Sequence, residues 1–183
     1  MANQTAIDGP PFDLTLAMAI RSQIKRLRKE PSLSAKRLLS RVAYFRGNEF
    51  RAPSSSVAKV TKEGAKVVQE TIQVLNKCPP LMFDDDKTYV SLDLAAEDHA
   101  AYIGSAGIVS HMGEGETSPH ERIERYAKWI QATGEVIWYG TIDHDKNTQA
   151  TAQEIIDDLI IDDGVPSRGH RIGNSDAINP TIT

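Results

Sequence analysis

Histidine and carboxylate side chains are the groups in this sequence with the greatest capacity for chemistry. His111 stands in a polar, glycine-rich stretch, and His170 stands between Gly169 and Arg171. Two neutral imidazoles combined with carboxylates suit zinc or another borderline divalent ion, and such a set leaves positions open for water. An isolated histidine in a loop is more often solvated or simply hydrogen-bonded, so residue types alone leave both interpretations open.

Three acids could join these histidines. Glu135 opens an apolar segment and needs a partner if it is buried, because an unpaired buried carboxylate is costly. Glu154 lies within a predicted helix, and Asp157 is a rival for the same role one turn along the same side. A glutamate on an exposed helix face is usually just solvated, which is the plainer account of Glu154.

Other chemistries find little support. Cys78 is the single cysteine, which excludes an internal disulfide and a cysteine zinc cluster. There is no Ser or Cys nucleophile with a nearby ordered base, and no glycine pattern forms a phosphate loop. His99, on an apolar helix face, is expected to be a satisfied packing residue. Four acids near the end of the last predicted helix lack calcium-loop spacing and are expected to form a solvated helix end: Asp157, Asp158, Asp162 and Asp163.

Hydrophobic periodicity and helix-start signals predict a mostly helical chain. The predicted helices cover 14–29, 34–47, 61–77, 92–103, 118–129 and 148–161. The β-branched and aromatic segment 135–139, between two glycines, is the one strong strand, whereas 50–56 and the tail from residue 165 resemble loops. A lone strand cannot satisfy its own backbone hydrogen bonds, so this strand requires partners.

The bulk composition indicates a globular chain with one basic stretch. Its 183 residues suffice for one domain, and no apolar run approaches the roughly 20 residues of a membrane span. The net charge is −4, yet residues 21–51 hold ten Lys or Arg and two acids. Such a stretch could bind an anionic partner through Arg26, Arg28 and Arg37, although a solvated helix face is the plainer explanation. Sequence-specific nucleic-acid recognition is not expected, because few aromatics accompany the arginines.

An ordered set of motifs, none specific by itself, resembles the CAP superfamily (the cysteine-rich secretory protein, antigen 5 and pathogenesis-related 1 group). The resemblance covers residues 60–180 well and 20–56 more loosely. The motifs follow in chain order: Leu94-Ala95-Ala96-Glu97-Asp98-His99, Ser110-His111-Met112-Gly113, Ser118-Pro119 with Glu121-Arg122-Ile123, Gly134-Glu135-Val136-Ile137, and Val165-Pro166-Ser167-Arg168-Gly169-His170-Arg171.

This resemblance implies an α+β fold of the CAP type, an α-β-α sandwich. It implies a lead and basic helical extension over 1–56 and the CAP domain over 57–183. The family cleft holds two histidines and two acids that bind a divalent ion, often zinc, and family members bind sterols, fatty acids or other partners. By motif the cleft residues are His111, Glu135, Glu154 and His170, with Asp157 as the rival for Glu154.

The sequence departs from the family pattern in two places. Val136 stands where the family usually has Asn, and this loss is expected to loosen the site. Two further strands follow the Gly-His-Arg motif in the family, whereas this sequence ends at Thr183. We therefore expect a mostly helical chain with an incomplete sheet, as a fragment, as a degenerate paralogue, or completed by a protein partner or self-association. The family is commonly secreted, but residues 1–20 lack a signal-peptide pattern, so the compartment stays open.

Three functions are compatible with these features. The favoured one is a non-catalytic CAP module that binds a divalent ion and a lipid, protein or anionic-surface partner, because most family members are not demonstrated enzymes. A metal-dependent hydrolase would use Glu135 or Glu154 as general base and the ion to lower the pKa of a bound water. A truncated interaction protein without a working cleft would act through the basic stretch alone.

Overall fold

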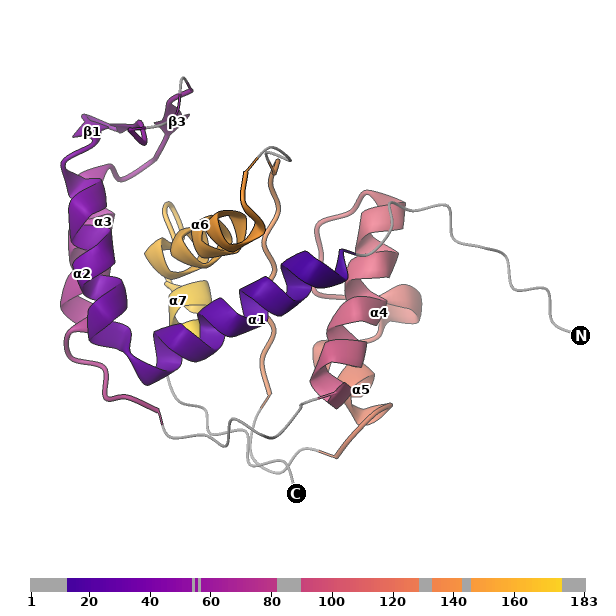
Figure 1. The fold of residues 1–183 in the computed structure, drawn as a ribbon. Coiled ribbons are helices and arrows are strands. Elements are labelled where there is room, and N and C mark those ends of the chain that lie inside the picture. The colour runs from indigo at the N-terminus through magenta and orange to yellow at the C-terminus, as the bar shows by residue number, and fades with distance from the viewer. Residues whose placement is uncertain are drawn as a thin grey trace, which may run out of the picture. The chain divides into compact units, whose positions relative to one another are not determined.

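The chain forms two compact units. The computed structural model describes residues 13–53, 55, 57–81, 90–128, 133–142 and 146–175. The first unit is built from Asp84–Tyr139, and the second from Thr15–Phe83 and Gly140–Ala177. Both consist mainly of helices, and the second adds a small antiparallel sheet (Figure 1). The predicted coarse α+β class is thus confirmed, whereas the domain boundary at residue 57 stays a prediction.

Five helices make up most of the second unit. Two of them, α1 (Leu14–Lys29) and α6 (Thr148–Ile161), have the bounds that periodicity predicts. The predicted 34–47 and 61–77 helices are shorter or shifted, as α2 (Pro31–Val42) and α3 (Ala65–Leu75). The fifth, α7 (Gly169–Ser175), lies where the sequence indicates only turn residues, so that prediction is wrong.

The core of the second unit lies where α3 packs against α2 and α6, and α7 packs on α6 (Figure 1). Its largest fully buried apolar side chains are Leu38, Val67, Val68, Leu75, Ile156 and Ile160. Burying a side chain of this kind contributes about 1.5–3 kcal/mol, so these positions supply much of the unit's stability. Thr71 is buried among them because its hydroxyl donates to the carbonyl of Val67 at 2.8 Å.

Pro31 acts at once as a helix stop and a helix start. It disfavours the helical conformation at Glu30, which has φ −136° and ψ 60°, and so α1 ends at Lys29. It then occupies the first position of α2, where its missing N–H leaves no intrahelical bond unmade. The sequence predicts the stop at Pro31 but places the next helix start three residues too late, at Ser34.

The sheet is not predicted from the sequence: its first strand lies at the end of the predicted 34–47 helix, and its other two strands lie at either side of the predicted 50–56 loop. β1 (Phe45–Arg46), β2 (Glu49–Phe50) and β3 (Lys59–Val60) pair antiparallel in that order. Phe45 faces Phe50 across the first pair, with ring centroids 5.2 Å apart. Gly47 makes the tight turn between them with φ 60°, a conformation that favours glycine. These two-residue strands carry no apolar alternation long enough to be recognised in sequence.

The first unit contains α4 (Val90–Ala106), a single 3₁₀ turn η1 (Glu114–Glu116) and α5 (Pro119–Glu124). Ala95, His99 and Ile103 of α4 and Ile123 of α5 are buried. α4 includes the predicted 92–103 helix. α5 begins where Ser118 and Pro119 predict, but it ends at Glu124, and residues 129–132 lie outside the described part of the chain.

The predicted strand over 135–139 is wrong. Residues 133–142 form no strand or helix, although valine, isoleucine and aromatic residues at 136–139 favour one locally. A strand needs a ladder partner, and neighbouring groups hold this segment instead: the backbone N–H of Ser110 donates to the Tyr139 hydroxyl at 3.1 Å. Separately, no helix in the described ranges is long and apolar enough to cross a membrane.

Candidate functional site

Three polar residues of the first unit surround the carboxylate of Glu135, and together with it they form what we call the His111 cluster: His99, His111, Arg122 and Glu135. His99 lies on α4 and Arg122 on α5. His111 lies in the connection between these helices, and Glu135 comes from the irregular segment 133–142. Two helices and two loops therefore place the cluster, which explains why no local sequence pattern reports it.

Glu135 is the centre of the His111 cluster. Its Oε2 accepts from the Arg122 guanidinium at 2.6 Å, and its Oε1 accepts from His111 Nδ1 at 2.9 Å. His99 Nε2 lies 3.6 Å from the same Oε1. The Glu135 side chain is 18% exposed, so it has the partners that a largely buried carboxylate requires.

His111 is oriented by this contact. A carboxylate can only accept, so Nδ1 of a neutral His111 carries the proton and Nε2 carries the lone pair. The side chain is 53% exposed. This is the arrangement of metal-ligating histidines, which usually donate the second ring N–H to a carboxylate or a carbonyl. Glu135 thus acts here as the orienting group of His111.

Arg122 connects Glu135 to the loop that carries His111. One of its terminal nitrogens donates to the carbonyls of His111 at 3.1 Å and Thr117 at 2.8 Å. Gly113 is required beside it, because a Cβ there would lie 2.8 Å from the Thr117 hydroxyl and 3.0 Å from the guanidinium. The charged group therefore fixes the loop as well as the acid.

The start of α5 places Arg122 on its helix. The Ser118 hydroxyl accepts from the backbone N–H of Glu121 at 3.3 Å, and the Glu121 carboxylate accepts from the backbone N–H of Ser118 at 2.7 Å. This reciprocal capping box satisfies two N–H groups at the helix start. The bonds from the Ser118 backbone and hydroxyl hold the pKa of Glu121 below its ordinary value.

His99 is buried, as the sequence predicts, but only one of its nitrogens is satisfied. Nε2 lies 2.9 Å from the carbonyl of Ser110 and so donates to it. Nδ1 is buried and has no hydrogen-bond partner within the described part of the chain. The prediction of a packing residue is thus right in burial and incomplete in hydrogen bonding.

His170, in the second unit, is also held by a carboxylate. Its Nδ1 lies 2.7 Å from Asp162 Oδ1, and Asp162 Oδ2 accepts from the backbone N–H groups of His170 at 3.0 Å and Arg171 at 3.3 Å. The Asp162 side chain is 1% exposed. The prediction of a solvated helix end is therefore wrong for Asp162, because this acid turns inward to cap the start of α7.

The two acids that compete for the second acidic position differ in accessibility. Asp157 is buried, and its carboxylate accepts from Arg37 at 2.5 and 2.6 Å and from Arg41 at 2.8 Å. It too contradicts the expected solvated helix end. Glu154 is 53% exposed and pairs with Lys146 at 3.0 Å. Two arginines already neutralise Asp157, so Glu154 is the acid that can change partners.

The three arginines expected to bind an anionic partner have different surroundings. Arg26 is exposed on α1. Arg28 donates to the carbonyl of Gly173 at 3.3 Å, and Arg37 pairs with Asp157. Binding of an anion by these residues stays a prediction, and Arg37 would have to share its charge with Asp157.

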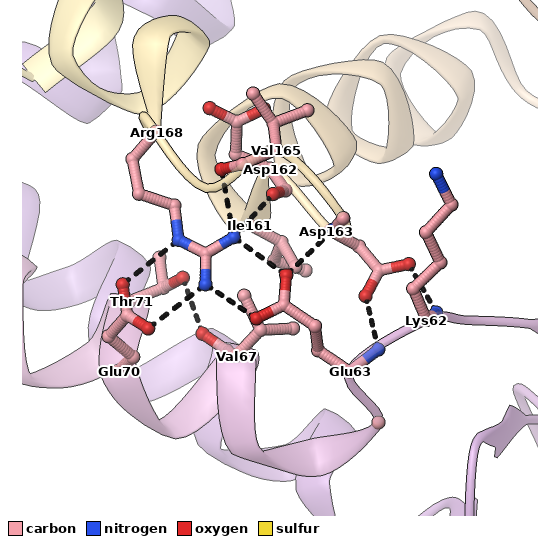
Figure 2. Close-up of polar contacts among 12 residues, drawn as sticks. Lys62, Glu63, Val67, Glu70, Thr71, Ile161, Asp162, Asp163, Val165 and Arg168 are labelled. Carbon is pink, nitrogen blue, oxygen red and sulfur yellow. Dashed lines mark hydrogen bonds and ion pairs between the residues drawn. The ribbon is translucent and has the colours of Figure 1, made fainter.

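A dense ion-pair network surrounds Arg168, which lies just before α7 (Figure 2). Its three guanidinium nitrogens donate to Glu63 at 2.6 and 2.7 Å and to Glu70 at 3.1 Å. The Arg168 guanidinium and the Gly164 N–H lower the pKa of Glu63 to about 2. The network ties the start of α3 to the end of α6.

Sequence reasoning missed two residues that organise the candidate site. Arg122 appeared only within a motif, and Asp162 appeared only as one of four acids. Both are buried. A charged residue among apolar neighbours is the available signal for such a role, because burial of a charge requires a specific partner.

The structure brings His111 and Glu135 together and gives Glu154 and His170 separate partners, Lys146 and Asp162. Within the described ranges, no group of three or more His, Cys, Asp or Glu side chains is arranged to hold a metal ion. No protein-family model, curated protein or solved structure matches the chain. The local geometry of each histidine is therefore the basis for a functional proposal.

Proposed function

We propose that this chain is a non-catalytic binding module of the CAP type that binds a divalent cation, with zinc as the best-suited ion. The candidate ligands are His111 and Glu135 in the first unit, and Glu154 and His170 in the second. The observation that carries the proposal is the His111–Glu135 contact of 2.9 Å, in which a carboxylate holds Nδ1 of an exposed imidazole. Neutral imidazole and carboxylate are the donor types that zinc accepts.

The role of each donor follows from its present contacts. His111 offers Nε2 without a change of tautomer. Glu135 would orient His111 or, on releasing Arg122, ligate the ion itself. Glu154 would exchange Lys146 for the cation, a small cost because the present pair is partly exposed. The bound cation would supply positive charge that neutralises these acids.

An apolar ligand, such as a sterol or fatty acid, is the partner we propose for the surface beside His111. Three exposed apolar side chains are close to this histidine in the sequence or contact its neighbour Ser110: Val109 and Met112 lie within two residues of His111, and the Tyr139 hydroxyl accepts from the Ser110 N–H. Isolated exposed apolar residues are ordinary, but several around one polar group are typical of ligand sites. In the alternative, a metal-dependent hydrolase, a cation-bound water would be the nucleophile.

Zinc titration of the purified chain tests this proposal. We expect the chain to bind zinc, and His111→Ala should weaken that binding at least tenfold because it removes a ligand. His120→Ala is the matched control, since His120 is exposed on α5 and lies outside the His111 cluster. Equal affinity in the two variants, or no zinc binding by the unchanged chain, would contradict the proposal.

A hydrolysis assay on the same samples separates the module from the enzyme. We expect no zinc-dependent turnover of ester or peptide substrates. Turnover that depends on zinc and disappears in Glu135→Gln would replace the binding module by a metal-dependent hydrolase.

A further inference from the structure

Asp162 holds His170 through a contact that the cleft residues implied by the resemblance do not include. Asp162 follows α6 in the left-handed conformation, with φ 58° and ψ 45°, and its side chain is almost completely buried. Its Oδ1 lies 2.7 Å from Nδ1 of His170. A buried acid in this conformation requires a specific reason, since both features cost free energy.

The two oxygens of Asp162 have different partners. Oδ2 accepts the backbone N–H groups of His170 and Arg171, at 3.0 and 3.3 Å. Oδ1 lies 2.7 Å from Nδ1 of the His170 imidazole. Because a carboxylate only accepts, a neutral His170 must carry its proton on Nδ1, which leaves the lone pair on Nε2.

The surrounding network keeps Asp162 in this position. Arg168 donates to the carbonyls of Asp162 at 2.9 Å and Val165 at 3.0 Å while it is clamped between Glu63 and Glu70 (Figure 2). The backbone of Arg168 has φ 53°, and its guanidinium bonds two carbonyls of the same loop. The neighbouring Asp163 accepts from the backbone N–H groups of Lys62 and Glu63, at 2.7 and 2.8 Å.

We infer that Asp162 is the positioning residue of His170: it fixes the tautomer that presents Nε2 to a divalent cation. The cation part of this inference rests on the proposed function. Asp162 stands to His170 as Glu135 stands to His111, with a carboxylate at Nδ1 in both units. Such outer carboxylates set ring orientation and ligand basicity in metal sites.

A purely structural role would make Asp162 only the cap of α7. Asp162→Asn separates the two roles, because the amide oxygen must replace Oδ2 to keep both backbone N–H bonds. The amide NH₂ group then replaces Oδ1 and faces Nδ1, which can accept only if it is unprotonated. In Asp162→Asn the hydrogen bonds to the start of α7 are therefore kept, and the ring proton of neutral His170 moves from Nδ1 to Nε2.

Long-range ¹H–¹⁵N spectroscopy of ¹⁵N-histidine-labelled full chain reports the tautomer, at a pH where imidazole is neutral. We expect the Nδ1–H form for His170 in the unchanged chain and the Nε2–H form in Asp162→Asn. Asp163→Asn is the matched control: it alters an adjacent acid that bonds other groups and should leave the tautomer unchanged. The Nε2–H form in the unchanged chain overturns the inference even if Asp162→Asn does not fold.

Titration with zinc alone completes the test. Asp162→Asn should weaken zinc binding about 10- to 100-fold while Asp163→Asn does not. A reversed tautomer with unchanged zinc affinity overturns the cation role. An unchanged chain that shows the Nδ1–H form and binds no zinc overturns the proposed function and the cation role together, and supports the tautomer assignment alone.

Discussion

Arg122 in the first unit and Arg171 in the second are two buried arginines with closely similar bonding. Each donates to two backbone carbonyls and pairs with one glutamate: Arg122 with Glu135 at 2.6 Å, and Arg171 with Glu70 at 2.5 Å. They differ at Nε. In Arg171 it donates to the carbonyl of Ile160 at 2.7 Å, whereas the buried Nε of Arg122 has no hydrogen-bond partner among the described residues.

The acids that pair with these two arginines also differ in what else they bind. Glu70 pairs with both Arg168 and Arg171. Orienting His170 falls instead to Asp162. In the first unit one acid, Glu135, both neutralises Arg122 and orients His111. The second unit therefore separates structural ion pairing from site orientation, and the first unit combines them.

The largest predicted effect of this difference between Arg122 and Arg171 is on the free energy of unfolding. Arg171→Met removes a guanidinium in which all three nitrogens donate hydrogen bonds. We expect the free energy of unfolding to fall by about 3–5 kcal/mol, as for other broken buried ion pairs. Arg122→Met should lower the free energy of unfolding by about 1–2 kcal/mol less than Arg171→Met does, because it also removes a buried, unsatisfied N–H. Urea unfolding of both variants measures the two free energies.

Arg26→Met provides the baseline for that experiment, because Arg26 is exposed and its loss should change stability by less than about 0.5 kcal/mol. An Arg122→Met variant at least as destabilised as Arg171→Met would contradict the predicted difference between the two arginines. It would mean that Glu135, deprived of its arginine, dominates the energetics of the first unit.

Much of the helical structure could be predicted from the sequence, whereas these arginines could not. Periodicity gives α1 and α6 their observed bounds because their apolar residues recur with the helix and meet a core. The carboxylate that pairs with Arg171 belongs to Glu70, which is 101 residues away in the chain. Contacts over such separations depend on packing that no local pattern encodes.

The candidate site was predictable in its residue types and not in its connections. Glu135 was placed at the start of a strand, yet its surroundings are a histidine and an arginine with no ladder beside it. Residues 136–139 are of types that favour strands locally, and in the structure 136–138 are half-buried while Tyr139 is exposed. Strand formation depends on a second chain segment, and that information is non-local.

The next effect concerns acid stability, and it contrasts Glu63 with Glu121. Arg168 and the Gly164 N–H lower the pKa of Glu63 from 4.5 to about 2. A depressed folded-state pKa stabilises the fold above the unfolded value, so this contribution is complete above about pH 4.5 and is lost as the pH falls toward 2. The stability gap between the unchanged chain and Glu63→Gln should therefore narrow over this range.

Unfolding midpoints measured between neutral pH and pH 3 test this expectation. Glu70 shifts in the same direction through Arg168 and Arg171, so the unchanged chain should lose stability on acidification even beyond the effect of Glu63. Glu121→Gln is the comparison from the first unit, where the bonds from Ser118 also lower the pKa. A gap for Glu63→Gln that widens with acid would contradict the assigned direction.

The smallest predicted effect is on the helix starts of the two units. Ser118→Ala removes the capping box of α5, and Asn147→Ala removes the side-chain oxygen that accepts from the backbone of Gln149 at 2.9 Å and Ala150 at 3.4 Å at the start of α6. Each should lower the free energy of unfolding in urea by about 1 kcal/mol.

The consequences for the candidate site differ, because α5 carries Arg122, which pairs with Glu135, whereas Asn147 supports a helix already held by its buried face. Ser118→Ala should thus also perturb the His111 imidazole resonances, and Asn147→Ala should leave them unchanged. Unperturbed resonances in both variants would show that Glu135 holds His111 without help from the helix that carries its arginine.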